Sequence, residues 1–479
     1  MSWLLVYRIA EWGLCLLMVP VILRRRFAPV TSLAWLSIIF FLPELGLIIY
    51  LLIGDNRLGR RRARMHRKVI ASMRTDQRLA YLRNHSDQPQ LNDAHRPMIL
   101  QAEQISGMGI LGENQVDLLA EPNQMVDRLV VDIDRAQHHV HLLFYIFAPD
   151  ATGRRVIESL IAAAQRGVKC RVLVDAVGSR QLFGFRQRSL IRQLKDRGVQ
   201  IQRALPASPL RRRLARLDLR NHRKLAVIDG RIAYTGSQNI VDADYGHRRT
   251  TPWIDLSGRF IGPIVGQLQT VFLEDWAFET DQTLQEDDIF PRLESAGSMY
   301  AQTVPTGPTQ ESIALLRVTI AAINAAQRKV LITSPYFVPD EPTMLALSMA
   351  ADRGVEVNIV VPSRSDHPLV SAAGRAYFDI LLDAGVHIHQ HTRGLLHAKT
   401  ITVDDGFALL GSSNFDIRSF YLNFEINVLL YGQEVTQKVR FAQMRYLSES
   451  TPINYDKWRH RPALQRFTDS VAALLSPLL

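Results

Sequence analysis

Two short segments of this 479-residue chain each place a histidine two residues before a lysine. The pairs are His222 with Lys224, and His397 with Lys399. Apolar residues follow each pair, as in a buried β-strand, where side chains two positions apart project from the same face. An imidazole can attack an electrophile or move a proton, and an ammonium group stabilises negatively charged oxygens. The pattern therefore predicts chemistry on an anionic group such as a phosphate.

The same polar residues follow each pair at the same distances. The first copy continues to Asp229, Ser237 and Asn239, and the second continues to Asp404, Ser412 and Asn414. A turn at each aspartate should fold the next strand back antiparallel. We expect this return to bring Ser237 and Asn239 beside His222, and Ser412 and Asn414 beside His397. We count the two aspartates with the histidines and lysines as catalytic candidates, and the serines and asparagines as candidates for binding or supporting the phosphate.

The segments before these motifs are also duplicated. Residues 136–150 match residues 326–340 in sequence, at a constant offset of 190 residues. In both copies a periodic apolar segment, a strand-like run (170–174 or 357–361) and a second helical segment ending in Gly-Val follow. Strands alternating with helices predict an α/β unit, so the chain is expected to contain two α/β repeats.

Two such half-sites facing each other would enclose one phosphodiester between two histidines. One imidazole would attack phosphorus and form a phosphohistidine, while the other would protonate the leaving alkoxide. Lys224 and Lys399 would balance the charge that builds on the phosphate oxygens.

The complete pattern is His-x-Lys, four residues, Asp, six residues and Gly-Ser, and it occurs twice. It resembles the signature of the phospholipase D superfamily. The resemblance implies two repeats with pseudo-twofold symmetry, a phosphohistidine intermediate, and no metal or other cofactor. It also implies that His222 is the nucleophile and His397 the acid and base. The family's acidic residue that orients a histidine corresponds to Glu425, with Asp255 as its counterpart in the first repeat.

Further segments are similar to bacterial cardiolipin synthases within that superfamily. They are residues 32–54, 334–339 and 414–419. This resemblance implies that two phosphatidylglycerol molecules are joined into cardiolipin with release of glycerol, at a lipid bilayer. A phospholipase D hydrolase or a phosphatidylserine synthase would use the same residues with water or serine as acceptor. A nuclease of the same superfamily is a third alternative.

The N-terminal region contains two long apolar runs. Residues 3–23 would form a helix of about 31 Å, which matches a hydrocarbon layer of about 30 Å, and residues 30–53 form the second run. We predict a hairpin of two transmembrane helices. A cleaved signal peptide is disfavoured because no small-residue cleavage site precedes the second run. A re-entrant segment is the other alternative.

The charge of the chain is concentrated beside these runs. The net charge is +11, and residues 1–68 carry +8 of it, from eleven Arg and Lys against three acidic residues. Ten of the eleven basic residues lie in the connector at 24–26 and after the second run at 57–68, and the larger second cluster favours a cytoplasmic catalytic body. The resemblance to bacterial cardiolipin synthases implies a multi-pass protein of the bacterial inner membrane. The rest of the chain carries only +3, so no nucleic-acid partner is expected. An insertion with Arg211, Arg212, Arg213 and Arg216 is either a solvated loop or a contact with anionic lipids.

Cys15 and Cys170 are too few for a disulfide framework or a zinc cluster. The predicted organisation is therefore a membrane hairpin with its basic flank at 1–68, a first phospholipase D-like α/β repeat at 69–290 and a second at 291–479.

Overall fold

The computed structural model describes residues 3–25, 29–54, 95–206, 219–245, 252–292, 295–308, 313–474 and 476. The chain forms two compact units, which are treated separately below. One contains residues 1–64 and 207–219, and the other contains residues 65–206 and 220–479. The predicted basic insertion, with Arg211 to Arg213 and Arg216, lies outside the described residues.

In the described part of the larger unit, fifteen strands form one sheet. From the centre of the sheet outward, the strands of the two halves follow the same order, as pseudo-twofold symmetry requires, and β19 extends the second half by one strand. The first half has the order β4-β3-β2-β5-β6-β8-β1, and the second has the order β9-β18-β16-β15-β10-β12-β13-β19. The strands of the first half are β1 (Leu111–Leu119), β2 (His139–Phe144), β3 (Lys169–Asp175), β4 (Gln200–Ala204), β5 (Lys224–Ile228), β6 (Ile232–Gly236) and β8 (Ser257–Ile261). Those of the second are β9 (Met299–Thr306), β10 (Lys329–Thr333), β12 (Glu356–Pro362), β13 (His387–His391), β15 (Thr400–Val403), β16 (Phe407–Gly411), β18 (Glu425–Tyr431) and β19 (Ser450–Pro452). The two halves meet where β1 and β9 pair antiparallel.

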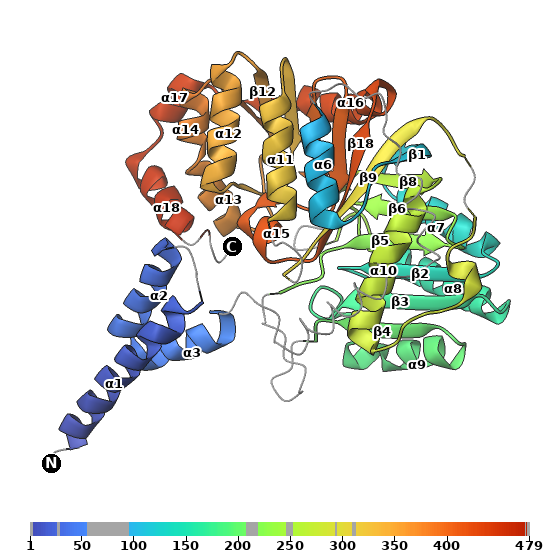
Figure 1. The fold of residues 1–479 in the computed structure, drawn as a ribbon, viewed down its shortest axis with the longest axis horizontal. Helices are drawn as coiled ribbons and strands as arrows, with labels where there is room; N and C mark the ends of the chain where they lie inside the picture. Colours follow the sequence, from blue (N-terminus) through green and yellow to red (C-terminus); the bar gives the residue numbers. More distant parts are fainter. Residues whose placement is uncertain are drawn as a thin grey trace. The chain divides into compact units, whose positions relative to one another are not determined.

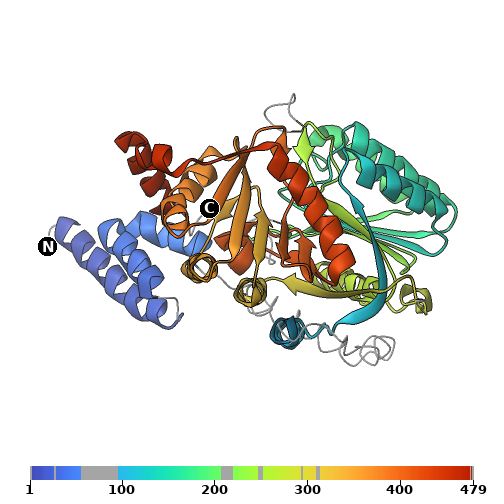
Figure 2. The same cartoon turned by 90° about the horizontal axis from the view of Figure 1, so that it is seen from above.

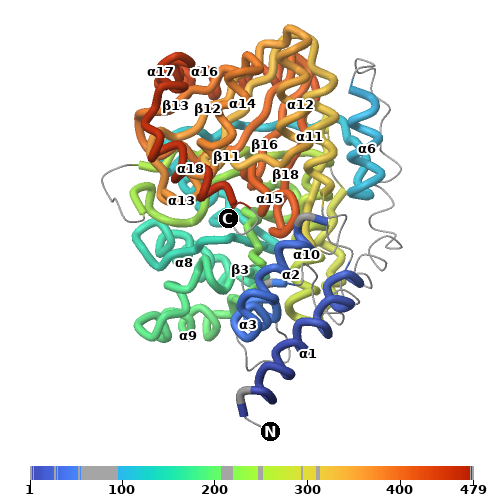
Figure 3. The backbone as a smooth tube through the Cα atoms, turned by 90° about the vertical axis from the view of Figure 1, so that its left-hand side faces the viewer, coloured from blue at the N-terminus to red at the C-terminus, as the bar shows by residue number. Residues whose placement is uncertain are grey.

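Helices cover this sheet (Figure 1). Before β9 in the chain they are α6 (Arg96–Ser106), α7 (Gln124–Arg135), α8 (Ala151–Gln165), α9 (Arg188–Asp196) and α10 (Ile264–Thr280). In the second half they are α11 (Ala314–Ala325), α12 (Glu341–Asp352), α13 (Pro368–Arg375), α14 (Phe378–Asp383), α15 (Ile417–Tyr421), α16 (Gln433–Ser448), α17 (Tyr455–Arg459) and α18 (Ala463–Leu474). The α6 helix packs against α11 and β9 of the second half. Figure 3 shows α11, α12 and α14 grouped apart from α8 and α9, as two repeats require. Two short pairs complete the unit: β7 (Trp253–Ile254) with β14 (Leu395–Leu396), and β11 (Phe337–Val338) with β17 (Phe415–Asp416).

The duplicated sequence segments have a structural reason. Asp150 and Asp340, the last residues of the matching segments, accept hydrogen bonds from the backbone N–H groups of Gly153 and Thr343 and so cap α8 and α12. The two strand-like runs lie within β3 and β12. The prediction of two α/β repeats is confirmed.

The two repeats share one hydrophobic core. A single cluster of buried side chains contains Leu225 and Phe272 from the first half and Leu331, Leu410 and Ile426 from the second. Figure 2 shows α16 lying across the strands near the middle of this unit. Because the apolar surface is buried jointly, the halves form one folding unit rather than two independent ones.

The smaller unit corrects the predicted pair of transmembrane helices. Its first helix, α1 (Trp3–Leu23), includes the one stretch among the described residues that is long and apolar enough to cross a membrane, Leu5–Leu23. The second apolar run is not one helix. It is divided at Leu42 into α2 (Pro29–Phe41) and α3 (Pro43–Ile53), because Pro43 has no N–H to continue the hydrogen-bond ladder of α2 and its ring disfavours helical backbone in the residue before it.

The aspartate of each motif anchors a neighbouring strand. The β5 strand turns back into β6 directly after Asp229, which has a φ of +51°, as predicted for the antiparallel return. The carboxylate of Asp229 accepts hydrogen bonds from the backbone N–H groups of Gln137, His138 and His139 at 2.8 to 2.9 Å. Asp404, with a φ of +46°, does the same for residues 327–329. Each aspartate thus joins its turn to the start of β2 or β10.

We expect Asp229→Asn to destabilise the larger unit by about 2 to 3 kcal/mol, because an amide cannot accept all three of these hydrogen bonds and loses their charge assistance. The folded fraction should keep a near-normal kcat. Urea unfolding combined with initial rates below the transition tests this, and Asp404→Asn should behave in the same way. A variant with unchanged stability and no turnover would show that the aspartate takes part in the chemistry.

Candidate active site

Each motif histidine lies just before its strand rather than within it. Asn221, which precedes β5, forms an isolated parallel β-bridge with Phe424 of the second repeat. His222 then donates its backbone N–H to the carbonyl of Phe424 at 2.9 Å, and Phe424 donates to the carbonyl of Arg220 at 3.0 Å. This corrects the placement of the histidine within a strand, since pairing with the other repeat replaces pairing within its own.

The second histidine has the equivalent position. Leu395 and Leu396 of β14 pair parallel with Trp253 and Ile254 of β7, which belongs to the first repeat. His397 donates its backbone N–H to the carbonyl of Ile254 at 2.8 Å. The two histidines are therefore related by the pseudo-twofold symmetry of the sheet.

Each imidazole is held by a carboxylate from the opposite repeat. Nδ1 of His222 lies 3.1 Å from Oε2 of Glu425, and Nδ1 of His397 lies 2.6 Å from Oδ1 of Asp255. A carboxylate at Nδ1 favours the tautomer with the proton on Nδ1, which leaves the lone pair on Nε2. In both half-sites Nε2 is thus the nitrogen prepared to meet a substrate.

The serines support these carboxylates. Ser412 donates its hydroxyl hydrogen to Oε2 of Glu425, and Ser237 donates to Oδ1 of Asp255, both at 2.6 Å. Because Asp255 holds His397, Ser237 serves the histidine of the other repeat. The antiparallel return that was expected to bring Ser237 beside His222 and Ser412 beside His397 occurs, and each serine hydroxyl bonds the carboxylate that holds the histidine of the other repeat.

The two asparagines are buried close to these serines. Oδ1 of Asn239 accepts a hydrogen bond from the backbone N–H of Ile146 at 3.0 Å. The backbone N–H of Asn414 donates to the hydroxyl of Ser419 at 3.2 Å. These contacts fix the loops that follow β6 and β16.

The lysines are almost completely buried. Nζ of Lys224 donates to the carbonyl of His222 at 2.7 Å, and Nζ of Lys399 donates to that of His397 at 2.6 Å. Burial lowers the pKa of Lys224 to about 8, against the opposing effects of Glu425 and Asp255. Burial and the nearby Lys224 charge lower the pKa of Lys399 to about 7. Both ammonium groups are therefore poised to gain from a phosphate anion that would compensate their charge.

The imidazoles are neutral at pH 7 in the substrate-free site. Burial and the nearby Lys399 lower the pKa of His397 to about 4, and burial also lowers the pKa of His222. The carboxylates stay ionised: although burial opposes it, contact with His397 and Lys399 lowers the pKa of Asp255 to about 2. The pKa of Glu425 is lowered by His222 and Lys224 in the same way, also against burial.

Other residues that position the site were missed in the sequence. Arg223, between the motif histidine and lysine, is 1% exposed, and its side chain donates to Asp275 of α10 at 2.7 Å and to the carbonyl of Glu425 at 3.0 Å. The ring of Tyr145 lies 4.7 Å from that of His222, and the ring of Trp253 lies 4.9 Å from that of His397. The only sequence signals were that Arg223 adjoins His222 and Lys224 and that Trp253 lies two residues before Asp255, while Asp275 and Tyr145 lie on other elements.

The structure does not bring Asp229 and Asp404 into the site. They lie at the far ends of β5 and β15 from the lysines, where they bind backbone N–H groups. Their assignment as catalytic residues is corrected to a structural role, because a motif spacing cannot distinguish a residue at the site from one that holds the hairpin. Among the described residues, no group of three or more His, Cys, Asp or Glu side chains is arranged to hold a metal ion.

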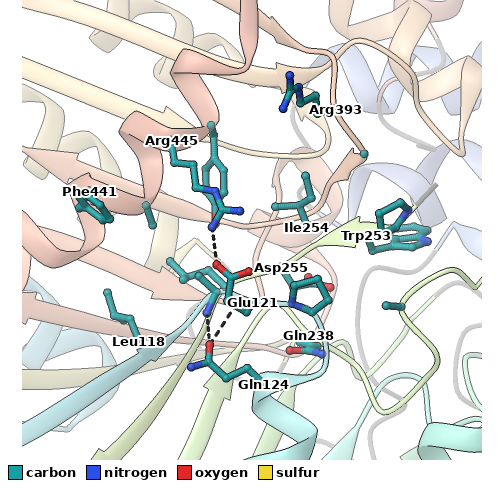
Figure 4. A pocket seen from close by; sticks show the side chains of 18 of the residues that line it. Leu118, Glu121, Gln124, Gln238, Trp253, Ile254, Asp255, Arg393, Phe441 and Arg445 are labelled. Carbon is teal, nitrogen blue, oxygen red and sulfur yellow. Dashed lines mark hydrogen bonds and ion pairs between the residues drawn. The ribbon is translucent and has the colours of Figure 1, made fainter.

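A cavity of about 1020 Å³ opens beside Asp255. Figure 4 shows Asp255 and Gln238 in the middle, with Trp253 on one side and Phe441 and Leu118 on the other. Charged side chains of both signs also line it, among them Glu121 and Arg445, which form an ion pair at 2.5 Å, together with Arg393 and Lys438. The cavity thus combines apolar walls with six carboxylates, that of Asp255 among them, and three basic side chains.

Comparison with protein families agrees with this geometry. Residues 129–276 and 319–444, one segment from each repeat, match the family described as cardiolipin synthase, phospholipase D-like domain. The chain belongs to this family.

Relatives of the chain extend over its whole length. It is 35% identical to cardiolipin synthase A of Yersinia pseudotuberculosis serotype O:1b and to that of Yersinia pestis bv. Antiqua, over all of this chain and 98% of each relative. The crystal structure of phosphatidylserine synthase from Haemophilus influenzae superposes with a TM-score of 0.58 at 15% identity, covering 80% of this chain and all of the other. The second similarity shows a shared fold.

The buried lysines predict opposite effects of pH on activity and on stability. As pH rises from about 6.5 to 9, the folded enzyme loses the charge of Lys399 near pH 7 and that of Lys224 near pH 8, so kcat/KM for an anionic substrate should fall. The unfolded lysines keep their protons to about pH 10.4, so the free energy of unfolding contributed by these groups should rise over the same range.

The measurements are a pH–rate profile and urea unfolding at each pH. Lys399→Arg, if it retains activity, should keep its charge and move the alkaline limb upward, whereas Lys195→Arg on the exposed face of α9 should not. If kcat/KM falls at alkaline pH only where the protein unfolds, deprotonation of Lys399 and Lys224 is not the cause of the fall.

Proposed function

We propose that this protein is a cardiolipin synthase, a phosphatidyltransferase that moves the phosphatidyl group of one phosphatidylglycerol onto a hydroxyl of a second and releases glycerol. The main support is the pair of histidines, each with its Nδ1 on a carboxylate and its Nε2 prepared for a substrate. The full-length similarity to cardiolipin synthases A supports the choice of substrate.

In the first step Nε2 of His222 attacks phosphorus, and the bond from phosphorus to the glycerol oxygen breaks. His397 gives a proton to that leaving oxygen, so glycerol departs neutral and a phosphatidyl-histidine remains. The pKa of His397 is about 4 in the substrate-free site, so it must rise when the anionic phosphate enters. Substrate binding thus favours the protonated form of His397, which is the form that can act as the acid.

In the second step a hydroxyl of another phosphatidylglycerol replaces glycerol at the same place. His397, now neutral, removes the proton of that hydroxyl, the oxygen attacks phosphorus, and the bond to His222 breaks. One phosphodiester is formed for each one broken, so the reaction is close to balanced in free energy and added glycerol should reverse it.

The remaining residues supply charge and orientation. Lys224 and Lys399 neutralise the two non-bridging phosphate oxygens, while Glu425 and Asp255 keep each imidazole in one tautomer and stabilise it when it is protonated. Two buried ammonium groups provide the charge that a metal ion supplies elsewhere, so we propose that no cofactor is required. The apolar residues that line the cavity beside Asp255 suit the acyl chains of a lipid substrate.

The proposed location is the bacterial inner membrane, with the catalytic unit on the cytoplasmic side. The support is the apolar helix α1 together with the basic residues at 57–68. Phosphatidylglycerol and cardiolipin are then the bilayer lipids around the enzyme, and no nucleic-acid partner is proposed.

A substrate whose leaving group needs no proton should separate the two histidines. With a phosphatidyl ester of p-nitrophenol, His397→Ala should still release one nitrophenol per enzyme molecule and then stall, because only the return step needs the base. His222→Ala should release none. With phosphatidylglycerol both variants should lose activity by at least a factor of about 10³.

Mass spectrometry under alkaline conditions should find the phosphatidyl group on His222 of the stalled enzyme. A burst in His222→Ala together with none in His397→Ala would exchange the two roles. Bursts in neither variant would contradict the covalent route.

The product ratio tests the function itself. Vesicles of labelled phosphatidylglycerol should yield cardiolipin in excess over phosphatidic acid, and added glycerol should suppress net synthesis and convert cardiolipin back. Thin-layer separation of the lipids measures both, with His222→Ala as the blank.

The alternatives give different products. Phosphatidic acid as the main product, unaffected by glycerol, would identify a hydrolase. Phosphatidylserine formed on addition of serine, in preference to cardiolipin, would identify a phosphatidylserine synthase. Either result would reject the synthase proposal and leave the two-histidine chemistry in place.

A further inference from the structure

The N-terminal unit is held together by contacts that define the path of its three helices. The α2 helix runs back along α1: Cys15 donates from Sγ to the carbonyl of Ile39 at 3.5 Å, and the rings of Trp12 and Phe40 lie 6.2 Å apart. At the start of α3, Tyr7 donates its hydroxyl hydrogen to Glu44 at 2.5 Å. The break between α2 and α3 therefore lies beside residues 7–12 of α1, short of its N-terminal end.

The α3 helix then folds back on α2. The rings of Trp35 and Tyr50 have centroids 5.3 Å apart, although fifteen residues of continuous helix would separate them by about 22 Å. A Cβ on Gly46 would lie 2.9 Å from both the carbonyl oxygen of Ile38 and the Cα of Ile39. Glycine thus allows the two backbones to approach closely just after the Leu42–Pro43 break.

Neither arm of this hairpin is long enough to cross a bilayer. The α2 helix has 13 residues and α3 has 11, which correspond to about 20 and 17 Å, against a hydrocarbon layer of about 30 Å. The α1 helix has 21 residues, or about 31 Å. The outer faces are apolar, with Leu17 on α1, Phe41 on α2 and Leu51 on α3 between 65 and 84% exposed. Such faces suit lipid chains.

The charged side chains within these helices are paired inside the unit. Glu44, near the tip of the hairpin, accepts from Tyr7, and Arg8 forms an ion pair with Glu11 at 3.1 Å. An ionisable group at membrane depth is tolerated when it has such a partner. The tip can therefore rest inside the bilayer rather than beyond it.

The distribution of charge decides between two topologies. If both apolar runs crossed the membrane, the three arginines at 24–26 and the seven basic residues at 57–68 would lie on opposite sides. If α2 and α3 enter and leave on one side, all ten lie on that side, which satisfies the preference for basic residues in the cytoplasm.

We propose that α1 crosses the membrane once, with the N-terminus outside, and that α2 and α3 form a re-entrant wedge that enters from the cytoplasmic side, passes the middle of the bilayer beside α1 and returns to the same side. The connector at 24–28 and the chain after Ile53 then lie on the cytoplasmic side together. The apolar partner of the wedge is the acyl-chain region of the bilayer. The proposal is independent of the reaction that the enzyme performs.

Cysteine labelling distinguishes the topologies. In full-length protein carrying Cys15→Ser and Cys170→Ala, single cysteines are introduced as Ser2→Cys, Ala28→Cys and Glu158→Cys and exposed to a membrane-impermeant maleimide in spheroplasts. We expect Ser2→Cys to be labelled in intact spheroplasts, and the other two only after lysis. Retained lipid product in each variant shows that the protein folds.

Labelling of Ala28→Cys in intact spheroplasts, with Ser2→Cys and Glu158→Cys protected, would establish a two-pass hairpin and overturn the proposal. Protection of all three would show that no helix spans, and would overturn it as well. Activity is measured separately, so failure of the topology and failure of the proposed reaction give different results.

Crosslinking tests the wedge directly. In the same cysteine-free background, Trp35→Cys with Tyr50→Cys should be joined by a short bismaleimide in native membranes, giving a crosslinked peptide in mass spectrometry. Val6→Cys with Val21→Cys has the same spacing within the continuous helix α1 and should not be joined. Equal yields for the two pairs, or none for the first, would contradict the fold-back of α3.

Discussion

The structure of the catalytic unit depends on an exchange of carboxylates between its two repeats. Glu425 of the second repeat holds the imidazole of His222, and Asp255 of the first holds that of His397. Lys224, Lys399 and His397 are buried, and burial of the two ammonium groups is tolerated because each half supplies a carboxylate to the other. Neither repeat alone can make a complete half-site, which explains why the sheet is continuous through β1 and β9 and why the core is shared.

The same exchange prepares the site for one charged group. Burial lowers the pKa of each lysine although two carboxylates lie nearby, so an anion bound at the ammonium groups would stabilise their charged form. A phosphodiester carries a single negative charge and would raise the pKa of the lysines and of His397 together. Binding and activation of the acid are therefore the same electrostatic event.

Prediction from sequence worked where the structure is local or duplicated. The helix caps at Asp150 and Asp340 and the hairpin after Asp229 are determined by residues close in sequence. Because segments of this kind recur along the chain, two α/β units could be predicted. Prediction failed where a residue's partner lies in the other repeat or where one proline interrupts an apolar run. The sequence did not show that Ser237 serves His397 through Asp255, and it led to Asp229 and Asp404 being assigned to chemistry. Residues 30–53 were predicted as one transmembrane helix, although α2 ends before Pro43.

By itself the sequence determined the family, the fold class and the identity of the two histidines and two lysines, because a motif of constant spacing that occurs twice can be recognised from the order of the residues alone. Only the tertiary structure decided which carboxylate orients which histidine, since Glu425 is 203 residues from His222 and Asp255 is 142 from His397. It also decided the path of the apolar segments, where hydropathy reports that residues prefer lipid but not the direction in which the chain runs. In both cases the arrangement is stabilised by contacts between segments that are far apart in the sequence, and the spacing of residues within one segment does not indicate such contacts.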